Sequence, residues 1–190
     1  MVLNKIGLTG ATGMLGRHLR AVLEGAGARV IALSRESEIT NEVVGWNLKE
    51  WKSLNDLNLI FDDVQAVVHA GAMLPGGSGY GGEDLMFDAN VRSSVNLGLW
   101  AIERQVPVVY VSGAIVYKDQ GEIDLDESAE LGWNDLGGFY GFSKLLAEDA
   151  LRRLCSGGLK LAVVRPSSIY GFGLPENKMI SGFLNKAKEG

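Results

Sequence analysis

The sequence alternates short apolar runs with longer segments in which apolar residues recur every three to four positions. Two of the short runs, 108–111 and 162–164, are apolar at every position, as expected for strands buried on both faces of a sheet. An alternation of strands and helices along a chain predicts a parallel sheet with helices on both faces. Strands are predicted over 5–9, 29–33, 43–46, 66–69, 106–112 and 160–164.

The longer segments have the periodicity of amphipathic helices. In 14–24, Leu15, Leu19 and Leu23 fall on one face, and the glycine-rich turn that follows should end the helix. A chain of 190 residues fits one domain with its own core, so we expect residues 1–190 to form a single α/β domain. Helices are predicted over 14–24, 89–104, 140–154 and 181–188.

Composition argues against several classes of function. Lys and Arg number 18 against 23 Asp and Glu, a net charge of −5 without a basic run, which argues against nucleic acid or an anionic membrane as a partner. Cys155 is the single cysteine, and neither His18 nor His69 belongs to a metal-ligand pattern, so we expect no disulfide framework and no metal. Because no apolar run approaches a membrane span or the core of a signal peptide, we expect a cytoplasmic protein.

A glycine triplet follows the first predicted strand and opens the first predicted helix. Gly10 permits the tight turn, Gly13 lets a pyrophosphate approach the backbone, and Gly16 lets the helix pack close to the strand. The start of the helix supplies amide donors and the positive end of its dipole to phosphates. Placed between a strand and a helix, the triplet predicts a nicotinamide dinucleotide, NAD or NADP, in a Rossmann-type doubly wound fold rather than an ordinary turn.

The end of the second predicted strand bears on which dinucleotide binds. Sites that prefer NAD place an acidic side chain here for the adenosine 2′-hydroxyl. This sequence has Ser34 and Arg35, with no acid before Glu36. A hydroxyl followed by a guanidinium suits a 2′-phosphate, so NADP is favoured over NAD. The alternative is that Arg35 is a solvated surface charge.

Tyr140 and Lys144 are four residues apart, on one face of a predicted helix. A phenol is a poor acid or base at neutral pH, and a neighbouring cation that stabilises phenolate lowers its pKa. We therefore expect Tyr140 to act as a proton carrier. The pair is common on amphipathic helices, and only its place downstream of a glycine-loop βα array makes it specific.

Together these features resemble the extended branch of the short-chain dehydrogenase/reductase family, which contains nucleotide-sugar epimerases and dehydratases. The matching segments run along the whole sequence: the glycine loop 9–16, Asn47-Leu48 where the family has Asp-Leu beside the adenine, 67–72 beneath the adenine ribose, the helix 90–97, Tyr140 with Lys144, and 165–171 flanking the nicotinamide.

The resemblance implies roles for individual residues. Tyr140 would be the general acid/base, Lys144 its pKa tuner and a ribose ligand, and 166–169 would lie along the nicotinamide. Asn90 would order a water or the strand beside the active site, or else cap a helix. The cofactor-binding residues would be Gly10, Thr12, Gly13, Met14, Leu15, Gly16, Ser34, Arg35, Asn47, Leu48, Ala70, Gly71, Ala72, Asn90, Pro166, Ser168 and Ile169.

The sequence departs from the family pattern at the catalytic hydroxyl. The family's Ser or Thr lies four residues before the tyrosine of a Val-Tyr pair, and this sequence has Gly113 there, with Ser112 one place earlier. Adjacent strand residues point to opposite faces, so Ser112 serves as a catalytic hydroxyl only if the strand frays there. Otherwise the site lacks a carbonyl-polarising donor, a loss of about 2–4 kcal/mol of barrier lowering by analogy with oxyanion donors.

The second departure is length. Family members continue for about another hundred residues, which close over the substrate, so we expect the C-terminal substrate lobe to be missing or truncated here, in either a fragment or a naturally short member. The glycine-rich segment 76–82 should follow the fourth strand, where it would be either a lid over substrate or a surface loop. Trp133 should lie on a loop before Tyr140, near the active site.

Two classes of function are consistent with the sequence. The first is an NAD(P)-dependent epimerase, dehydratase or reductase that acts on a nucleotide sugar or another small hydroxyl or carbonyl substrate, with Tyr140 as acid/base. The second is a non-catalytic NAD(P)-binding sensor or scaffold of the same fold, which Gly113 and the short chain favour. Either leaves open a homodimer.

Overall fold

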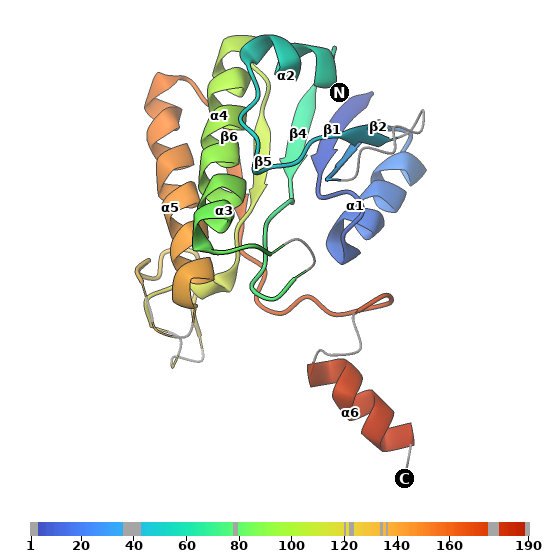
Figure 1. Cartoon of the computed structure of the whole chain (residues 1–190), viewed down its shortest axis with the longest axis vertical. Coiled ribbons are helices and arrows are strands. Elements are labelled where there is room, and N and C mark those ends of the chain that lie inside the picture. The colour runs from blue at the N-terminus through green and yellow to red at the C-terminus, as the bar shows by residue number, and fades with distance from the viewer. Residues whose placement is uncertain are drawn as a thin grey trace.

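The computed structural model describes residues 4–35, 43–77, 80–119, 121, 124–133, 135, 137–174 and 179–188. Six strands form one sheet in the order β3-β2-β1-β4-β5-β6, and every neighbouring pair is parallel (Figure 1). The strands are β1 (Lys5–Thr9), β2 (Arg29–Ser34), β3 (Val43–Gly45), β4 (Ala66–His69), β5 (Val108–Val111) and β6 (Leu161–Val164). All six were predicted, which confirms the doubly wound parallel fold.

Helices connect the strands. A π-helical turn, Asp88–Arg92, joins α3 to α4, so this helix begins at Glu83, earlier than the predicted residue 89. Figure 1 shows α6 set apart from the sheet and its flanking helices. The α-helices are α1 (Met14–Gly25), α2 (Leu54–Ile60), α3 (Glu83–Phe87), α4 (Ser93–Arg104), α5 (Gly138–Leu154) and α6 (Met179–Lys188), with 3-10 turns at Ala114–Val116 and Cys155–Gly157.

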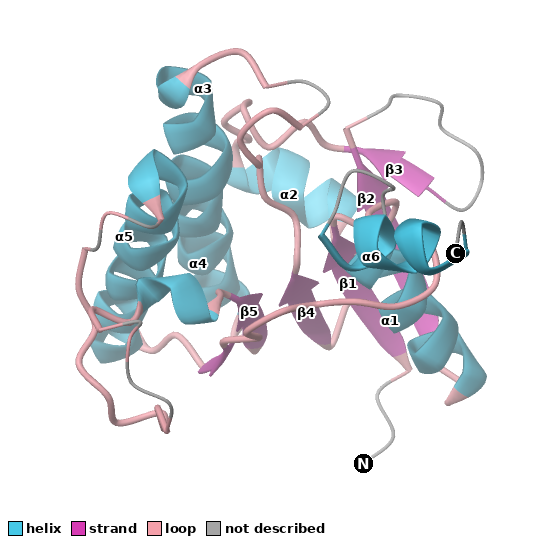
Figure 2. Ribbon diagram, turned by 90° about the horizontal axis from the view of Figure 1, so that it is seen from below, coloured by secondary structure: helices cyan, strands magenta, loops and turns pink. Residues whose placement is uncertain are grey.

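The hydrophobic core lies in two layers, one on each face of the sheet. On one face, Val67, Val108 and Tyr110 pack under α2, α4 and α5. On the other, Leu8 and Val30 pack against α1. The alternation of strand residues between these layers follows from the two-residue period of a strand. Figure 2 shows α1 and the α4–α5 pair on opposite sides of the strands.

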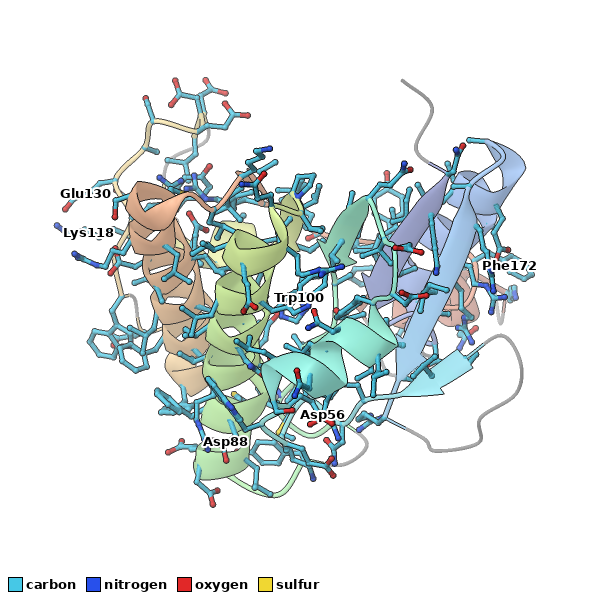
Figure 3. All side chains as sticks on the ribbon, turned by 90° about the horizontal axis from the view of Figure 1, so that it is seen from above. Asp56, Asp88, Trp100, Lys118, Glu130 and Phe172 are labelled. Carbon is cyan, nitrogen blue, oxygen red and sulfur yellow. The ribbon has the colours of Figure 1, made fainter. Side chains whose placement is uncertain are left out.

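The helix α2 was not predicted, because it is short and its periodicity covers only two turns. A capping box begins it: Ser53 Oγ accepts from the Asp56 amide at 3.1 Å, and Asp56 Oδ2 accepts from the Ser53 amide at 3.1 Å. Trp100 of α4 (Figure 3) donates to Asn58 Oδ1 at 2.9 Å. Its ring also packs against Phe61 in a tilted arrangement, with centroids 4.9 Å apart, so α4 is joined to α2.

The order of the strands determines where a ligand binds. The chain moves outward from β1 through β2 to β3, then crosses back to β4 on the other side of β1. In such sheets the crevice outside the carboxyl ends of the strands, where the order reverses, is the ligand site. The glycine loop follows β1, so it lies at this crevice. None of the helices in the described part of the chain is long and apolar enough to cross a membrane.

Candidate functional site

A cavity of about 440 Å³ lies at the carboxyl ends of the strands. It gathers fourteen of the predicted cofactor-binding residues: Gly10, Thr12, Gly13, Met14, Leu15, Gly16, Ser34, Arg35, Asn47, Leu48, Ala70, Gly71, Ala72 and Ile169. The predicted catalytic residues Ser112, Tyr140 and Lys144 line the same cavity. Asn90, Pro166 and Ser168 do not line it. The lining also includes four residues that the sequence motifs did not indicate: Trp46, Lys49, Met73 and Val111.

The glycine loop has a backbone shape that side chains would block. Gly10 has φ +69°, and a Cβ there would lie 2.7 Å from the Gly71 Cα. A Cβ on Gly16 would run into the carbonyl oxygen of Gly10. Gly13 is the N-cap of α1, whose first turn holds no acidic residue, so nothing there opposes a phosphate. The residues present therefore fit the pyrophosphate of a dinucleotide.

The end of β2 joins the glycine loop. The Ala11 amide donates to the Leu33 carbonyl at 3.1 Å, and the hydroxyls of Thr12 and Ser34 are 3.2 Å apart. Ser34 is buried, while Arg35 is exposed. Lys49, which follows Asn47 and Leu48, brings a second cation to the lining of the cavity. Glu36 lies outside the described residues.

A chain of buried hydrogen bonds links the glycine loop to the helix formed by α3 and α4. Thr9 Oγ1 accepts from the Gly71 amide at 3.0 Å and lies 2.7 Å from His69 Nδ1. Ser94 Oγ donates to the Asn90 carbonyl at 2.7 Å and lies 3.0 Å from His69 Nε2. Since the Ser94 proton is committed to a carbonyl, His69 Nε2 must be the donor to Ser94, and the Thr9 hydroxyl then donates to Nδ1.

This assignment requires a neutral His69. Burial, with a smaller contribution from the charge of Lys144, lowers the pKa of His69 to about 3. The imidazole therefore stays uncharged at neutral pH and joins β4 to β1 and α4. No local motif signals this role, because Thr9 and Ser94 are far from His69 in the sequence.

Asn90 supports the cavity from behind. Its Oδ1 accepts from the Met73 amide at 2.7 Å, and its Nδ2 donates to the Met73 carbonyl at 3.1 Å and to Ser143 Oγ at 2.9 Å. Ser143 in turn donates to the Tyr140 carbonyl at 2.8 Å. The alternative that Asn90 caps a helix is wrong, because Asn90 lies inside the π-helical turn between α3 and α4. Such turns are frequent at functional sites.

Lys144 points into the protein from α5. It is 2% exposed, its Nζ donates to the Val111 carbonyl at 2.7 Å, and Nζ lies 4.2 Å from the centre of the Tyr110 ring. Burial lowers the pKa of Lys144 to about 7, against the opposing effect of the Glu148 carboxylate. Lys144 thus titrates near neutral pH in this structure.

The pKa of Tyr140 is raised, whereas the sequence predicted that Lys144 would lower it. Its side chain is partly buried, and this burial raises the pKa of the phenol above its ordinary value. The expected lowering by Lys144 is not what this structure gives, because the Lys144 ammonium is directed to the Val111 carbonyl and the Tyr110 ring. Tyr140 is therefore a protonated phenol at neutral pH here.

Gly113 stands at the position where the family has a catalytic hydroxyl, and the neighbouring hydroxyl is that of Ser112. The Ser112 hydroxyl is enclosed by protein, and no described residue makes a hydrogen bond with it. It lies close enough to Glu148 to help lower the pKa of that carboxyl group. Gly113 is extended, and a Cβ there would meet its nearest neighbours, Ile115 Cγ2 and the Pro166 carbonyl oxygen, at 3.7 and 3.9 Å.

The segment after β6 passes the glycine loop. A Cβ on Gly171 would lie 3.6 Å from Met14 Cε, and Ile169 lines the cavity while Ser168 is exposed. Phe172 is 95% exposed and lies at the periphery, beyond α1 (Figure 3). Trp133, also exposed, is not part of the lining.

The structure describes part of the glycine-rich segment that was expected to be a lid or a surface loop. Of the glycine-rich segment 76–82, Gly77 lines the cavity, and 78–79 lie outside the described residues. Across the described ranges no group of three or more His, Cys, Asp or Glu could hold a metal ion.

Comparison with known proteins places the chain in a family. A model of the "NAD dependent epimerase/dehydratase family" matches residues 6–190. A UDP-N-acetylglucosamine 4-epimerase from Bacillus cereus is 32% identical, with a TM-score of 0.79 over 98% of this chain and 63% of that chain. A short-chain dehydrogenase/reductase superfamily protein from Agrobacterium tumefaciens, solved with bound NAD, is 28% identical, with a TM-score of 0.77 over 94% of this chain and 54% of that chain.

A third solved structure shares the fold. The dTDP-glucose 4,6-dehydratase from Bacillus anthracis, in complex with NAD, is 22% identical, with a TM-score of 0.77 over 98% of this chain and 62% of that chain. The chain thus spans between 54% and 63% of the length of these three proteins. Because the family model covers nearly every residue, the chain belongs to the NAD-dependent epimerase/dehydratase family.

Proposed function

We propose that the protein binds NADP in the cavity and carries out hydride and proton transfer at a carbinol or carbonyl carbon of a small substrate. The observation that carries this proposal is that the glycine loop and the Tyr140/Lys144 pair line one cavity. A nucleotide sugar is the favoured substrate class, since the solved relatives include a UDP-N-acetylglucosamine 4-epimerase and a dTDP-glucose 4,6-dehydratase. Epimerase, dehydratase and reductase activities all use this chemistry.

The preference for NADP rests on the end of β2. A 2′-phosphate needs donors and positive charge, and this corner offers the Ser34 and Thr12 hydroxyls with the Arg35 guanidinium. Lys49 supplies a second cation to the lining. No acidic residue of the described structure lines the cavity to accept from a 2′-hydroxyl.

Tyr140 and Lys144 carry the proton chemistry. When bound, a nicotinamide accepts a hydride from a carbinol carbon or returns one to a carbonyl carbon. Tyr140, protonated at neutral pH, holds the proton that a reduced carbonyl oxygen needs, and takes it back when the carbinol is oxidised. An ammonium has three donors, so Lys144 can donate to the Val111 carbonyl and also serve a cofactor hydroxyl.

A second candidate, a non-catalytic dinucleotide sensor, is favoured by one observation. Gly113 lacks a hydroxyl, and the hydroxyl of Ser112 is enclosed. Gly113→Ser separates the two candidates, because a Cβ at Gly113 makes only ordinary van der Waals contacts. In an enzyme, the added donor should raise turnover by up to about 100-fold, whereas in a sensor it changes nothing.

The Tyr140→Phe variant tests the proposed acid/base role. Turnover, followed by nicotinamide absorbance with a panel of sugar nucleotides, aldehydes and ketones, should fall by about 100- to 10,000-fold. The dissociation constant for NADPH should stay within about threefold of the original, because the phenol is not needed to hold the phosphates. Unchanged turnover would remove Tyr140 from the mechanism.

A further inference from the structure

A buried ion pair lies one helical turn beyond Lys144 along α5. Glu148 has no exposed surface, and the Arg165 side chain is 6% exposed. Arg165 Nη2 donates to Glu148 Oε1 at 2.6 Å, and Arg165 Nε donates to both carboxylate oxygens at 3.2 Å. Arg152 Nε adds a donor to Oε1 at 3.0 Å from a half-exposed position. Glu148 thus joins α5 to the residue that follows β6.

These donors keep Glu148 ionised. Burial by itself raises the pKa of this carboxyl group, but the hydrogen bonds from Arg165, the nearby Ser112 hydroxyl, and the charges of Arg165 and Arg152 outweigh it. The net pKa of Glu148 lies below its ordinary value. A full negative charge is therefore held inside the protein at neutral pH.

Lys144 and Glu148 are positions i and i+4 on α5, where Cβ atoms are about 5–6 Å apart. The other titratable groups near Lys144 are the Tyr140 phenol on α5, the Tyr110 phenol on β5 and the His69 imidazole on β4. Burial raises the pKa of both phenols and lowers that of His69 to about 3, so all three are neutral at pH 7. Within the described structure, Glu148 is the anion that acts on Lys144.

Arg165 is held on its other side as well. Its Nη1 donates to Tyr117 Oη at 3.2 Å and to the Glu127 carbonyl at 3.3 Å, and its guanidinium lies 5.1 Å from the centre of the Tyr117 ring. With its donors engaged, Arg165 cannot turn away from Glu148, and its charge offsets part of the carboxylate field. The strength of that field at Lys144 depends on this fixed geometry.

We propose that Glu148 is a positioning residue that keeps the Lys144 ammonium charged inside the protein, and that Arg165 limits this effect by neutralising part of the carboxylate charge. The inference rests on the function proposed above, in which Lys144 serves the cofactor beside Tyr140. It gives the two members of the ion pair opposite effects on Lys144. If the ion pair only stabilised the fold, removing either member would shift the Lys144 titration in the same direction.

The test is to measure the Lys144 titration directly, by NMR of isotope-labelled lysine side chains in the full chain, with Lys144→Met to assign the signal. Glu148→Gln should lower the pKa of Lys144 by about one pH unit or more, and Arg165→Met should raise it. Shifts of the same sign in both variants, or no shift in Glu148→Gln, would overturn the proposal.

Two further variants keep the test decisive. If Glu148→Gln does not fold, the double variant Glu148→Gln/Arg165→Met leaves no uncompensated buried charge. The pKa of Lys144 in the double variant should then lie below that in Arg165→Met, and equal values would overturn the proposal. Asp149→Asn removes the exposed Asp149–Arg153 pair of the same helix and should leave the Lys144 titration unchanged.

The titration requires no turnover, so it separates this inference from the proposed function. Opposite shifts in the two variants support the role of Glu148 even if Tyr140→Phe retains activity. In that case the proposed acid/base role of Tyr140 fails while the positioning role of Glu148 stands.

Discussion

The two ends of the cavity are built in different ways. At the glycine loop, backbone packs on backbone, and an added methyl group on Gly10 or Gly16 would collide with main-chain atoms. At the other end, Lys144 is buried in the lining, and one helical turn further along α5 the buried Glu148 forms an ion pair with Arg165. We therefore expect the stability of the glycine-loop end to be most sensitive to added atoms, and that of the Lys144 end to the loss of a charge.

The largest expected effect comes from removing one charge of the Glu148–Arg165 ion pair. Glu148→Gln leaves Arg165 buried without its partner and should lower the free energy of unfolding by about 3–5 kcal/mol. Glu148→Gln/Arg165→Met should cost much less, because both charges disappear together. Urea unfolding of the two variants measures the difference, and equal losses would show that the pair contributes no charge complementarity.

The corresponding change in the glycine loop is the addition of one methyl group, at Gly10. Gly10→Ala combines a positive φ with a contact to the Gly71 backbone, so we expect a loss of about 2–4 kcal/mol in unfolding free energy. Gly27→Ala is the control, since Gly27 also has a positive φ but open space around it. If both variants lose the same stability, the close approach at Gly10 is unimportant.

His69 hydrogen-bonds with Thr9 and Ser94, and its titration is expected to affect stability in acid. Its pKa is about 3 in the folded protein and about 6.5 unfolded, so the unfolded chain binds more protons below pH 6.5 and stability falls as pH falls. By pH 5 this amounts to about 2 kcal/mol. The difference in stability between pH 7 and pH 5 should shrink by that amount in His69→Gln but not in His18→Gln. An unchanged difference in His69→Gln would mean that His69 is not held neutral.

The smallest expected effect concerns the choice of cofactor. Arg35→Ser should weaken NADPH binding about tenfold while leaving NADH binding unchanged, since only the 2′-phosphate uses this charge. Lys49→Ser is the parallel variant on the neighbouring segment and should weaken NADPH in the same sense. Equal losses for both dinucleotides would show that these cations do not read the 2′-phosphate.

The sequence predicts local features of the fold well and tertiary ones poorly. The glycine loop is recognisable because its strand, turn and helix are contiguous, and the six strands follow from their apolar runs. By contrast, the hydrogen bonds of His69 to Thr9 and Ser94 form only when β1, β4 and α4 come together. The ion pair of Glu148 and Arg165 likewise depends on the packing of α5 against β6.

The same limit explains the differences within the site. The raised pKa of Tyr140 comes from burial, and a pattern of two residues on one helix face gives no measure of burial. Asn90 lies inside a helix instead of capping one, because the π-helical turn extends α4 backward through α3. Such an extension depends on how the helix packs, and no local start signal at residue 90 indicates it.

The central claim, that the cavity holds NADP, is tested most directly by titrating the full chain with NADPH and following energy transfer from tryptophan to the nicotinamide. We predict saturable binding of NADPH, at least about tenfold tighter than that of NADH, which Gly10→Ala abolishes and Tyr140→Phe retains. Absence of saturable binding for both dinucleotides would contradict the account.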